Sequence, residues 1–177
     1  GGEKRAQQRA LTALQGVVNK SAIHVYCFSA DMGATTALAA GFELTVIGKP
    51  KSAKTSADDT RQAAQTMKEM GLDLIVFAGG DGTARDVFSA IGSEFPVLGI
   101  PCGVKMHSGV YAVSPLAAAE ILNRLIDGKL VDIGLAEVRD IDEQAFRQGR
   151  VQSKFYGELL VPREGRFLQH VKSSGRE

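Results

Sequence analysis

The stretch LIVFAGGDGTARDV, residues 74–87, decides the fold. Its five apolar residues, 74–78, are typical of a buried strand, and residues 83–91 have the apolar spacing of a helix. Between them, Gly79-Gly80-Asp81-Gly82 connects the end of the strand to the helix. Ligands of parallel sheets gather at the carboxyl ends of strands. The turn is therefore either a tight connection or a site for something charged.

Strand and helix patterns alternate on both sides of this stretch. Strands are expected at residues 22–28, 42–48, 72–78 and 96–100, and helices at residues 3–19, 32–41, 57–70, 83–91 and 114–128. This alternation predicts an α/β fold, which we expect to be a three-layer sandwich with a mostly parallel sheet.

The alternation of strand and helix patterns ends after Val131. Residues 135–142 and 151–162 have strand patterns with no long helix between them. We therefore expect an α/β unit over residues 1–145 and the beginning of a β-rich unit over residues 146–177.

Charge and cysteine content exclude several classes of protein. The chain has 21 Lys and Arg against 20 Asp and Glu, a formal net charge of +1, so no basic field indicates nucleic acid or an anionic membrane as a partner. No apolar run approaches the roughly 18 residues that a membrane helix needs. Cys27 and Cys102 fit neither a disulfide framework nor zinc-ligand spacing. We expect a cytoplasmic protein.

The glycine turn suits an anion. Glycines allow a positive φ and let the backbone approach a ligand closely, while a helix N-terminus offers free N–H groups. The turn matches neither the dinucleotide fingerprint nor the Walker A loop. Asp81 would repel a phosphate unless a cation or a reacting hydroxyl lay between them, which favours magnesium contact or proton abstraction. The alternative is a simple turn in which Asp81 or Thr83 is the helix N-cap.

A second glycine-bearing loop, residues 99–115, follows one strand later and should flank the first. Gly103 gives it backbone freedom, and Lys105, His107 and Ser108 could donate hydrogen bonds to phosphate oxygens. Lys105 could equally be a solvated lysine and His107 a structural histidine.

Residues 55–60, TSADDT, open the helix before the glycine-turn strand. Thr55 and Asp58 could reach a ribose there. Helix capping explains the same residues equally well.

At these positions the sequence resembles a known group of proteins. Residues 79–83 resemble the GGDGT signature that NAD kinases share with diacylglycerol and sphingosine kinases. TSADDT, FAGGDGTARDV, GIPCGVKMHSGVYAVSP, EVRDID and YGELLVP together resemble the ATP-NAD kinase-like or polyphosphate-NAD kinase-like branch, which includes an acetoin-catabolism accessory protein. The resemblance implies the fold of the NAD kinase N-terminal domain, with nucleotide binding in residues 1–145.

The resemblance also implies an activity, which is phosphate transfer from ATP or polyphosphate, with magnesium, to the 2′-hydroxyl of NAD. Asp81 would activate that hydroxyl. The residues implied to hold donor phosphates and the nucleotide are Gly79, Gly80, Gly82 and Thr83, with Gly103 in the second loop. The role of Lys105 is inferred from its charge and position only. Pro101 stands where NAD kinases have Asn, so an amide contact there is not expected.

Two alternatives stay open: a nucleotide-binding accessory protein without turnover, and a relative of lipid or sphingoid-base kinases. Relatives begin with a further strand ending in an Asn-Pro-x-x-Gly turn and continue into a longer β-rich domain. We therefore expect the chain to be a fragment that can lack activity by itself, and the full-length protein to be a homo-oligomer.

Overall fold

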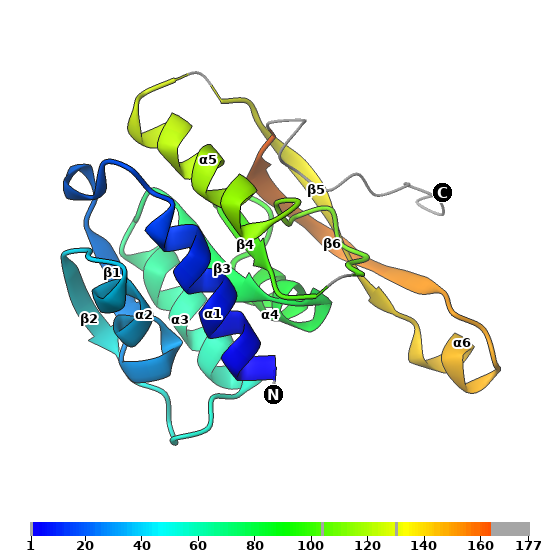
Figure 1. The fold of residues 1–177 in the computed structure, drawn as a ribbon. Helices are drawn as coiled ribbons and strands as arrows, with labels where there is room; N and C mark the ends of the chain where they lie inside the picture. Colours follow the sequence, from blue (N-terminus) through cyan, green and yellow to red (C-terminus); the bar gives the residue numbers. More distant parts are fainter. Residues whose placement is uncertain (1, 104, 130, 164–177) are drawn as a thin grey trace.

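The structure is a computed structural model that describes residues 2–103, 105–129 and 131–163 (Figure 1). Its elements, in chain order, are α1 (Gly2–Gln15), η1 (Lys20–Ala22), β1 (Val25–Phe28), η2 (Ala30–Met32), α2 (Ala34–Ala39), β2 (Leu44–Gly48), α3 (Ala57–Glu69), β3 (Ile75–Gly79), α4 (Asp81–Ile91), β4 (Val97–Pro101), α5 (Pro115–Ile126), β5 (Ile133–Ile141), α6 (Glu143–Arg147) and β6 (Ser153–Pro162). The α/β class predicted from the sequence is confirmed.

Parallel pairing holds the strands of the first part together. β1 pairs with β2, Val25 opposite Leu44, and β3 pairs with β4, Ile75 opposite Val97. These are two separate parallel pairs among the described strands, where one mostly parallel sheet was expected. In Figure 1, α1 and α5 lie in front of β3 and β4, with α3 and α4 behind, so helices cover this strand pair on two sides.

The core is centred on β4, all of whose residues are buried. Val87 and Ile91 of α4 pack into the same cluster as Leu98 of β4 and Ile121 of α5. Burying each such side chain stabilises the fold by about 1.5–3 kcal/mol. This packing fixes the start of α4 and the end of β4, and therefore the two glycine-bearing loops beside them.

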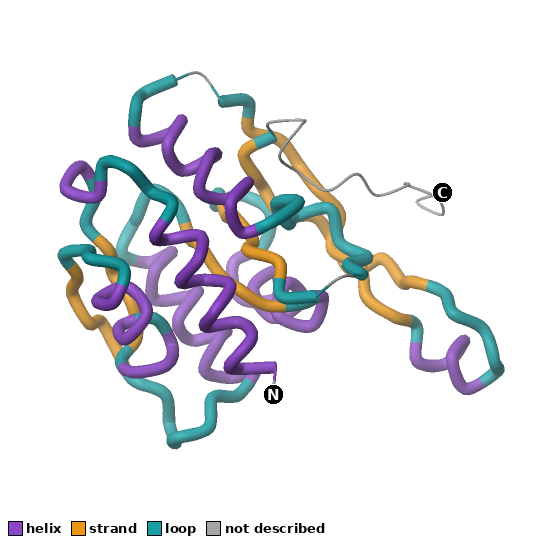
Figure 2. The backbone as a smooth tube through the Cα atoms, viewed as in Figure 1, coloured by secondary structure: helices purple, strands orange, loops and turns teal. Residues whose placement is uncertain are grey.

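The last described strands form a hairpin. β5 and β6 pair antiparallel, Ile133 opposite Pro162, and the short helix α6 lies at the tip, where no helix was expected (Figures 1 and 2). A parallel bridge between Pro96 and Leu160 joins β6 to the segment before β4. The expected division after residue 145 falls within α6, between two strands that pair with each other. The division into two domains stays a prediction.

Across the described ranges, no helix combines the length and the apolar character needed to cross a membrane.

Candidate functional site

The glycine turn begins α4 two residues earlier than expected. α4 starts at Asp81, and Gly80 is its N-cap, with no side-chain capping bond. The alternative in which Asp81 or Thr83 caps the helix is therefore wrong. Asp81 is the first helical residue at the carboxyl end of β3, where the partial positive charge of the helix is concentrated.

The three glycines of the turn are glycine for different structural reasons. None has a positive φ, so the expected left-handed conformation is absent from this turn. A Cβ at Gly79 would lie 2.3 Å from Oγ1 of Thr83, so Gly79 is needed for packing. A Cβ at Gly80 or Gly82 would meet nothing within 4 Å. Neither packing nor backbone strain within the described chain therefore explains these two glycines.

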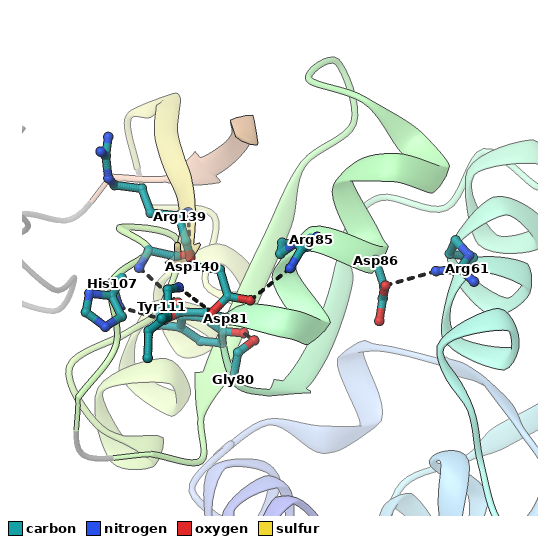
Figure 3. A network of polar contacts seen from close by, with 11 residues as sticks. Arg61, Gly80, Asp81, Arg85, Asp86, His107, Tyr111, Arg139 and Asp140 are labelled. Atoms are coloured by element: carbon teal, nitrogen blue, oxygen red, sulfur yellow. Dashed lines mark hydrogen bonds and ion pairs between the residues drawn. The ribbon is translucent and has the colours of Figure 1, made fainter. Parts of the chain in front are cut away.

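The carboxylate of Asp81 joins the two loops (Figure 3). Its Oδ2 accepts a hydrogen bond from the backbone N–H of His107 at 2.8 Å, and its Oδ1 accepts one from the backbone N–H of Ser108 at 2.9 Å. Asp81 is 9% exposed. The prediction that the two glycine-bearing loops lie together at one edge is therefore confirmed, with Asp81 as the contact between them.

Ser108 corrects the sequence-based assignment. Its hydroxyl donates to the backbone carbonyl of Arg139 and accepts from the backbone N–H of Arg139, both at 2.8 Å, and the residue is 0% exposed. The backbone N–H of Gly109 donates to the carbonyl of Glu137 at 2.8 Å. Because these bonds occupy the hydroxyl inside the protein, Ser108 fastens the loop to β5 and offers no donor to a phosphate in this structure.

Tyr111 contacts the glycine turn from the other end of the second loop. Its hydroxyl donates to the backbone carbonyl of Gly80, and its ring makes an edge contact with Phe77, with 5.6 Å between ring centroids. A Cβ at Gly99 would lie 2.5 Å from the ring, so Gly99 makes room for it. Burial, followed by the charge of Asp81, raises the pKa of the Tyr111 phenol well above its ordinary value.

The other predicted residues of the second loop are Gly103, Lys105 and His107. Lys105 is exposed and His107 is half-buried, while Gly103 packs near Met106, whose Sδ would lie 3.3 Å from an added Cβ. The contact shown for His107 is through its backbone N–H. The structure therefore leaves the Lys105 side chain at the surface beside the turn.

Residues 55–60 have a capping role. Ser56 is the N-cap of α3 and forms a capping box with Asp59, as the pattern allowed. Asp58 is exposed and pairs with Arg61, which also bonds Asp86 of α4 at 3.0 Å. Figure 3 shows the Arg61–Asp86 pair apart from the contacts of Asp81, so the described contacts do not bring Asp58 to the turn.

A cavity of about 300 Å³ lies beside α4, between α3 and β6. It is lined by Arg61, Arg85, Asp86, Phe88, Ser89 and Tyr156. The guanidinium of Arg85 lies 4.0 Å from the Tyr156 ring centroid and 3.2 Å from Asp140. Burial raises the pKa of Asp86, although Arg61 opposes the shift. None of the residues predicted for the site lines this cavity.

Two arginines of α1, Arg5 and Arg9, place positive charge near Cys102 in the second loop. Neither was predicted as a site residue. Burial raises the pKa of Cys102, while the charges of Arg9 and Arg5 oppose that rise. Both arginines are exposed and lie one helical turn apart on α1. No motif indicates them, because only the packing of α1 against β3 and β4 brings them to this edge.

In the described part of the chain, no group of three or more His, Cys, Asp or Glu residues is arranged to hold a metal ion. Hard cations such as magnesium are often held mainly by substrate phosphates and water. The residues present therefore do not fit a metal site of their own.

Comparisons with known proteins agree with the resemblance of the motifs. A family model described as the ATP-NAD kinase N-terminal domain matches residues 2–130. A curated protein of Citrobacter koseri, a probable lipid kinase YegS-like, is 31% identical over 87 residues. That alignment covers 46% of this chain and 29% of the relative, so the chain spans less than a third of the relative's length. No solved structure matches significantly.

Proposed function

The chain belongs to the ATP-NAD kinase N-terminal domain family, and on that basis we propose that it binds the nucleotide in a kinase that phosphorylates NAD. The phosphate donor is ATP or polyphosphate, and the acceptor is the 2′-hydroxyl of the adenosine ribose. The products are NADP and ADP, or a shortened polyphosphate.

The observation that carries this proposal is the open space beside Gly80 and Gly82. Within a helix, glycine is less favourable than alanine by about 0.5–1 kcal/mol, and Gly82 lies within α4. Neither glycine has a positive φ or a close neighbour that would exclude a Cβ. Close approach of a ligand to bare backbone is a reason for glycine at position 82, and a phosphate suits the N–H groups at the start of α4. Gly80 is the N-cap, where glycine is already favoured over alanine.

Basic side chains in or near the second loop are the proposed sources of further phosphate contacts. Lys105 is exposed on the loop that Asp81 holds. Arg5 and Arg9 bring positive charge to the segment after β4. A charge-assisted hydrogen bond from any of them to a phosphate oxygen would be about twice as strong as a neutral one.

Asp81 is the proposed base. In the proposed step, its carboxylate takes the proton of the ribose hydroxyl, the hydroxyl oxygen bonds to the terminal phosphorus, and the bond from that phosphorus to the bridging oxygen breaks. Each carboxylate oxygen accepts one backbone N–H and has capacity for a further hydrogen bond. Magnesium would accompany the phosphates, because the described residues supply no ligand set of their own.

One observation favours a second function, that of a nucleotide-binding protein without turnover. Asp81 is 9% exposed and both of its oxygens accept backbone N–H groups. In this second candidate the carboxylate only holds the loop. The same glycine turn would then bind a nucleotide and release it unchanged.

Turnover distinguishes the two functions. Full-length protein is incubated with NAD and either MgATP or polyphosphate, and NADP is measured; a diacylglycerol arm tests the lipid alternative suggested by the name of the Citrobacter koseri relative. The proposal predicts NADP in at least one arm and its loss in Asp81→Asn. Nucleotide binding without NADP would support the second function, and phosphorylated lipid without NADP would replace the acceptor.

A further inference from the structure

Tyr111 is the largest fully buried side chain of the described chain and is 0% exposed, yet it ends on a polar contact with the glycine turn. The ring is fixed on two sides, by Phe77 and by the bare backbone of Gly99. The backbone N–H of Ala112 donates to the carbonyl of Gly99 at 3.0 Å, which ties the residue after Tyr111 to β4. The position of the phenol oxygen is therefore set by the core.

The acceptor of that phenol is the carbonyl of Gly80, the N-cap of α4. The same carbonyl accepts the backbone N–H of Ala84 at 3.1 Å, the first hydrogen bond of the helix. Gly80 has no side chain, and nothing lies where its Cβ would be, so its carbonyl is held by the helix bond to Ala84 and by the Tyr111 phenol. Tyr111 adds a restraint from the core to the one that the helix itself supplies.

The phenol remains a donor over the whole physiological range. Burial raises its pKa well above the ordinary value, and Asp81 adds to the shift. A hydroxyl that stays protonated can always donate to the Gly80 carbonyl. Because a peptide is planar, fixing the carbonyl of Gly80 also fixes the direction of the N–H of Asp81.

We propose that Tyr111 is a positioning residue that orients the Gly80–Asp81 peptide so that the first N–H groups of α4 face a bound phosphate. The proposal rests on the proposed function only in taking the ligand to be a nucleotide phosphate. Without the hydroxyl, the helix bond from Ala84 is left as the hydrogen bond that holds the carbonyl, so the peptide is less firmly oriented toward the phosphate. Binding of the nucleotide should then weaken more than turnover of the bound nucleotide.

The test uses Tyr111→Phe in the full-length protein, which removes the hydroxyl and keeps the ring. Amide exchange of Ala84 is expected to accelerate about tenfold, while that of Gly92, at the other end of α4, stays unchanged. The dissociation constant and KM for MgATP are expected to rise about five- to tenfold, with kcat within about twofold. Tyr156→Phe, which removes the hydroxyl of a tyrosine on β6, is the matched control.

Gly99→Ala is the second variant, should Tyr111→Phe fold poorly. Its Cβ displaces the ring, so the hydroxyl is kept but moved away from the Gly80 carbonyl, and the same exchange and binding changes are expected. Unchanged Ala84 exchange and unchanged MgATP affinity in both variants, with NADP still formed, would overturn the positioning role alone. If the variants bind the nucleotide more weakly but the wild type forms no NADP, the proposed function alone is overturned. A wild type that binds no nucleotide would overturn both.

Discussion

The Oδ1 atom of Asp81 accepts the backbone N–H of Ser108 at 2.9 Å, across 27 positions of sequence. This bond joins the helix that follows β3 to the loop that follows β4. Ser108 then bonds the backbone of Arg139 on β5 through its hydroxyl. The glycine turn, the second loop and the hairpin are therefore connected through two side chains, and a change at either one should reach all three segments.

Replacing Asp81 by Asn affects both of its proposed roles, the loop contact and the base. The amide oxygen can accept one backbone N–H, but the amide nitrogen cannot accept the other, and the side chain cannot take a proton. We expect NADP formation to fall by about 10²- to 10⁴-fold, the usual contribution of a general base. Asp81→Glu, which keeps a base but moves it, serves as the comparison.

Hydrogen exchange of the His107 and Ser108 amides reports the structural role of Asp81 independently. Exchange that accelerates in Asp81→Asn while NADP formation is preserved would show that the residue holds the loop and does not carry the chemistry. If exchange is unchanged while NADP formation is lost, Asp81 acts as the base and does not hold the loop.

Replacing Ser108 by Ala should destabilise the protein. The N–H and carbonyl of Arg139 would each lose a buried 2.8 Å hydrogen bond, and loss of the two bonds is expected to cost about 1–3 kcal/mol. Urea denaturation measures the loss. Ser89→Ala is the control, because the exposed Ser89 hydroxyl bonds only within its own helix turn and should change stability by less than about 0.5 kcal/mol. Equal effects of the two variants would contradict the bridging role.

Alkaline pH should lower stability in a way that depends on Tyr111. Below a pH of about 10 the phenol is protonated in both the folded and the unfolded states. Above it the unfolded state releases the proton and the folded state, whose pKa is raised, retains it, so stability falls as pH rises, by up to about 1.4 kcal/mol per pH unit. Denaturation of wild type and Tyr111→Phe between about pH 9 and pH 11.5 measures the difference. If the free energy of unfolding depends on pH in the same way in both proteins, the pKa of the Tyr111 phenol is not raised by folding.

Local patterns were enough to predict the class of the fold and most of its elements. Apolar runs marked the cores of β1 to β4, and helix capping, one of the two explanations offered for residues 55–60, is present at the start of α3, where Ser56 is the N-cap. The start of α4 was misplaced because Gly80, as N-cap, bonds through backbone atoms alone and leaves no side-chain signature. α6 was missed because five residues are too few for a periodic pattern.

The contacts of the site could be predicted only in part. The resemblance and the order of the strands placed Asp81 and the second loop together. The use of the Ser108 hydroxyl could not be foreseen, because its partner is a backbone 31 positions away that any residue could supply. The same holds for Tyr111, whose role depends on its burial between Phe77 and Gly99.

The measurement closest to the central claim is the dissociation constant of MgATP for Gly82→Ala in the full-length protein. We expect Gly82→Ala to be more stable by about 0.5–1 kcal/mol, because alanine suits a helix better than glycine does. We also expect it to bind MgATP at least about tenfold more weakly, because the methyl group occupies the open space. Gly79→Ala should instead lose about 1–3 kcal/mol of stability through its contact with Thr83. Gly2→Ala, another glycine of a first helical turn with open space around it, is the matched control and should bind normally. Wild-type affinity in Gly82→Ala would contradict the claim that a phosphate approaches this backbone.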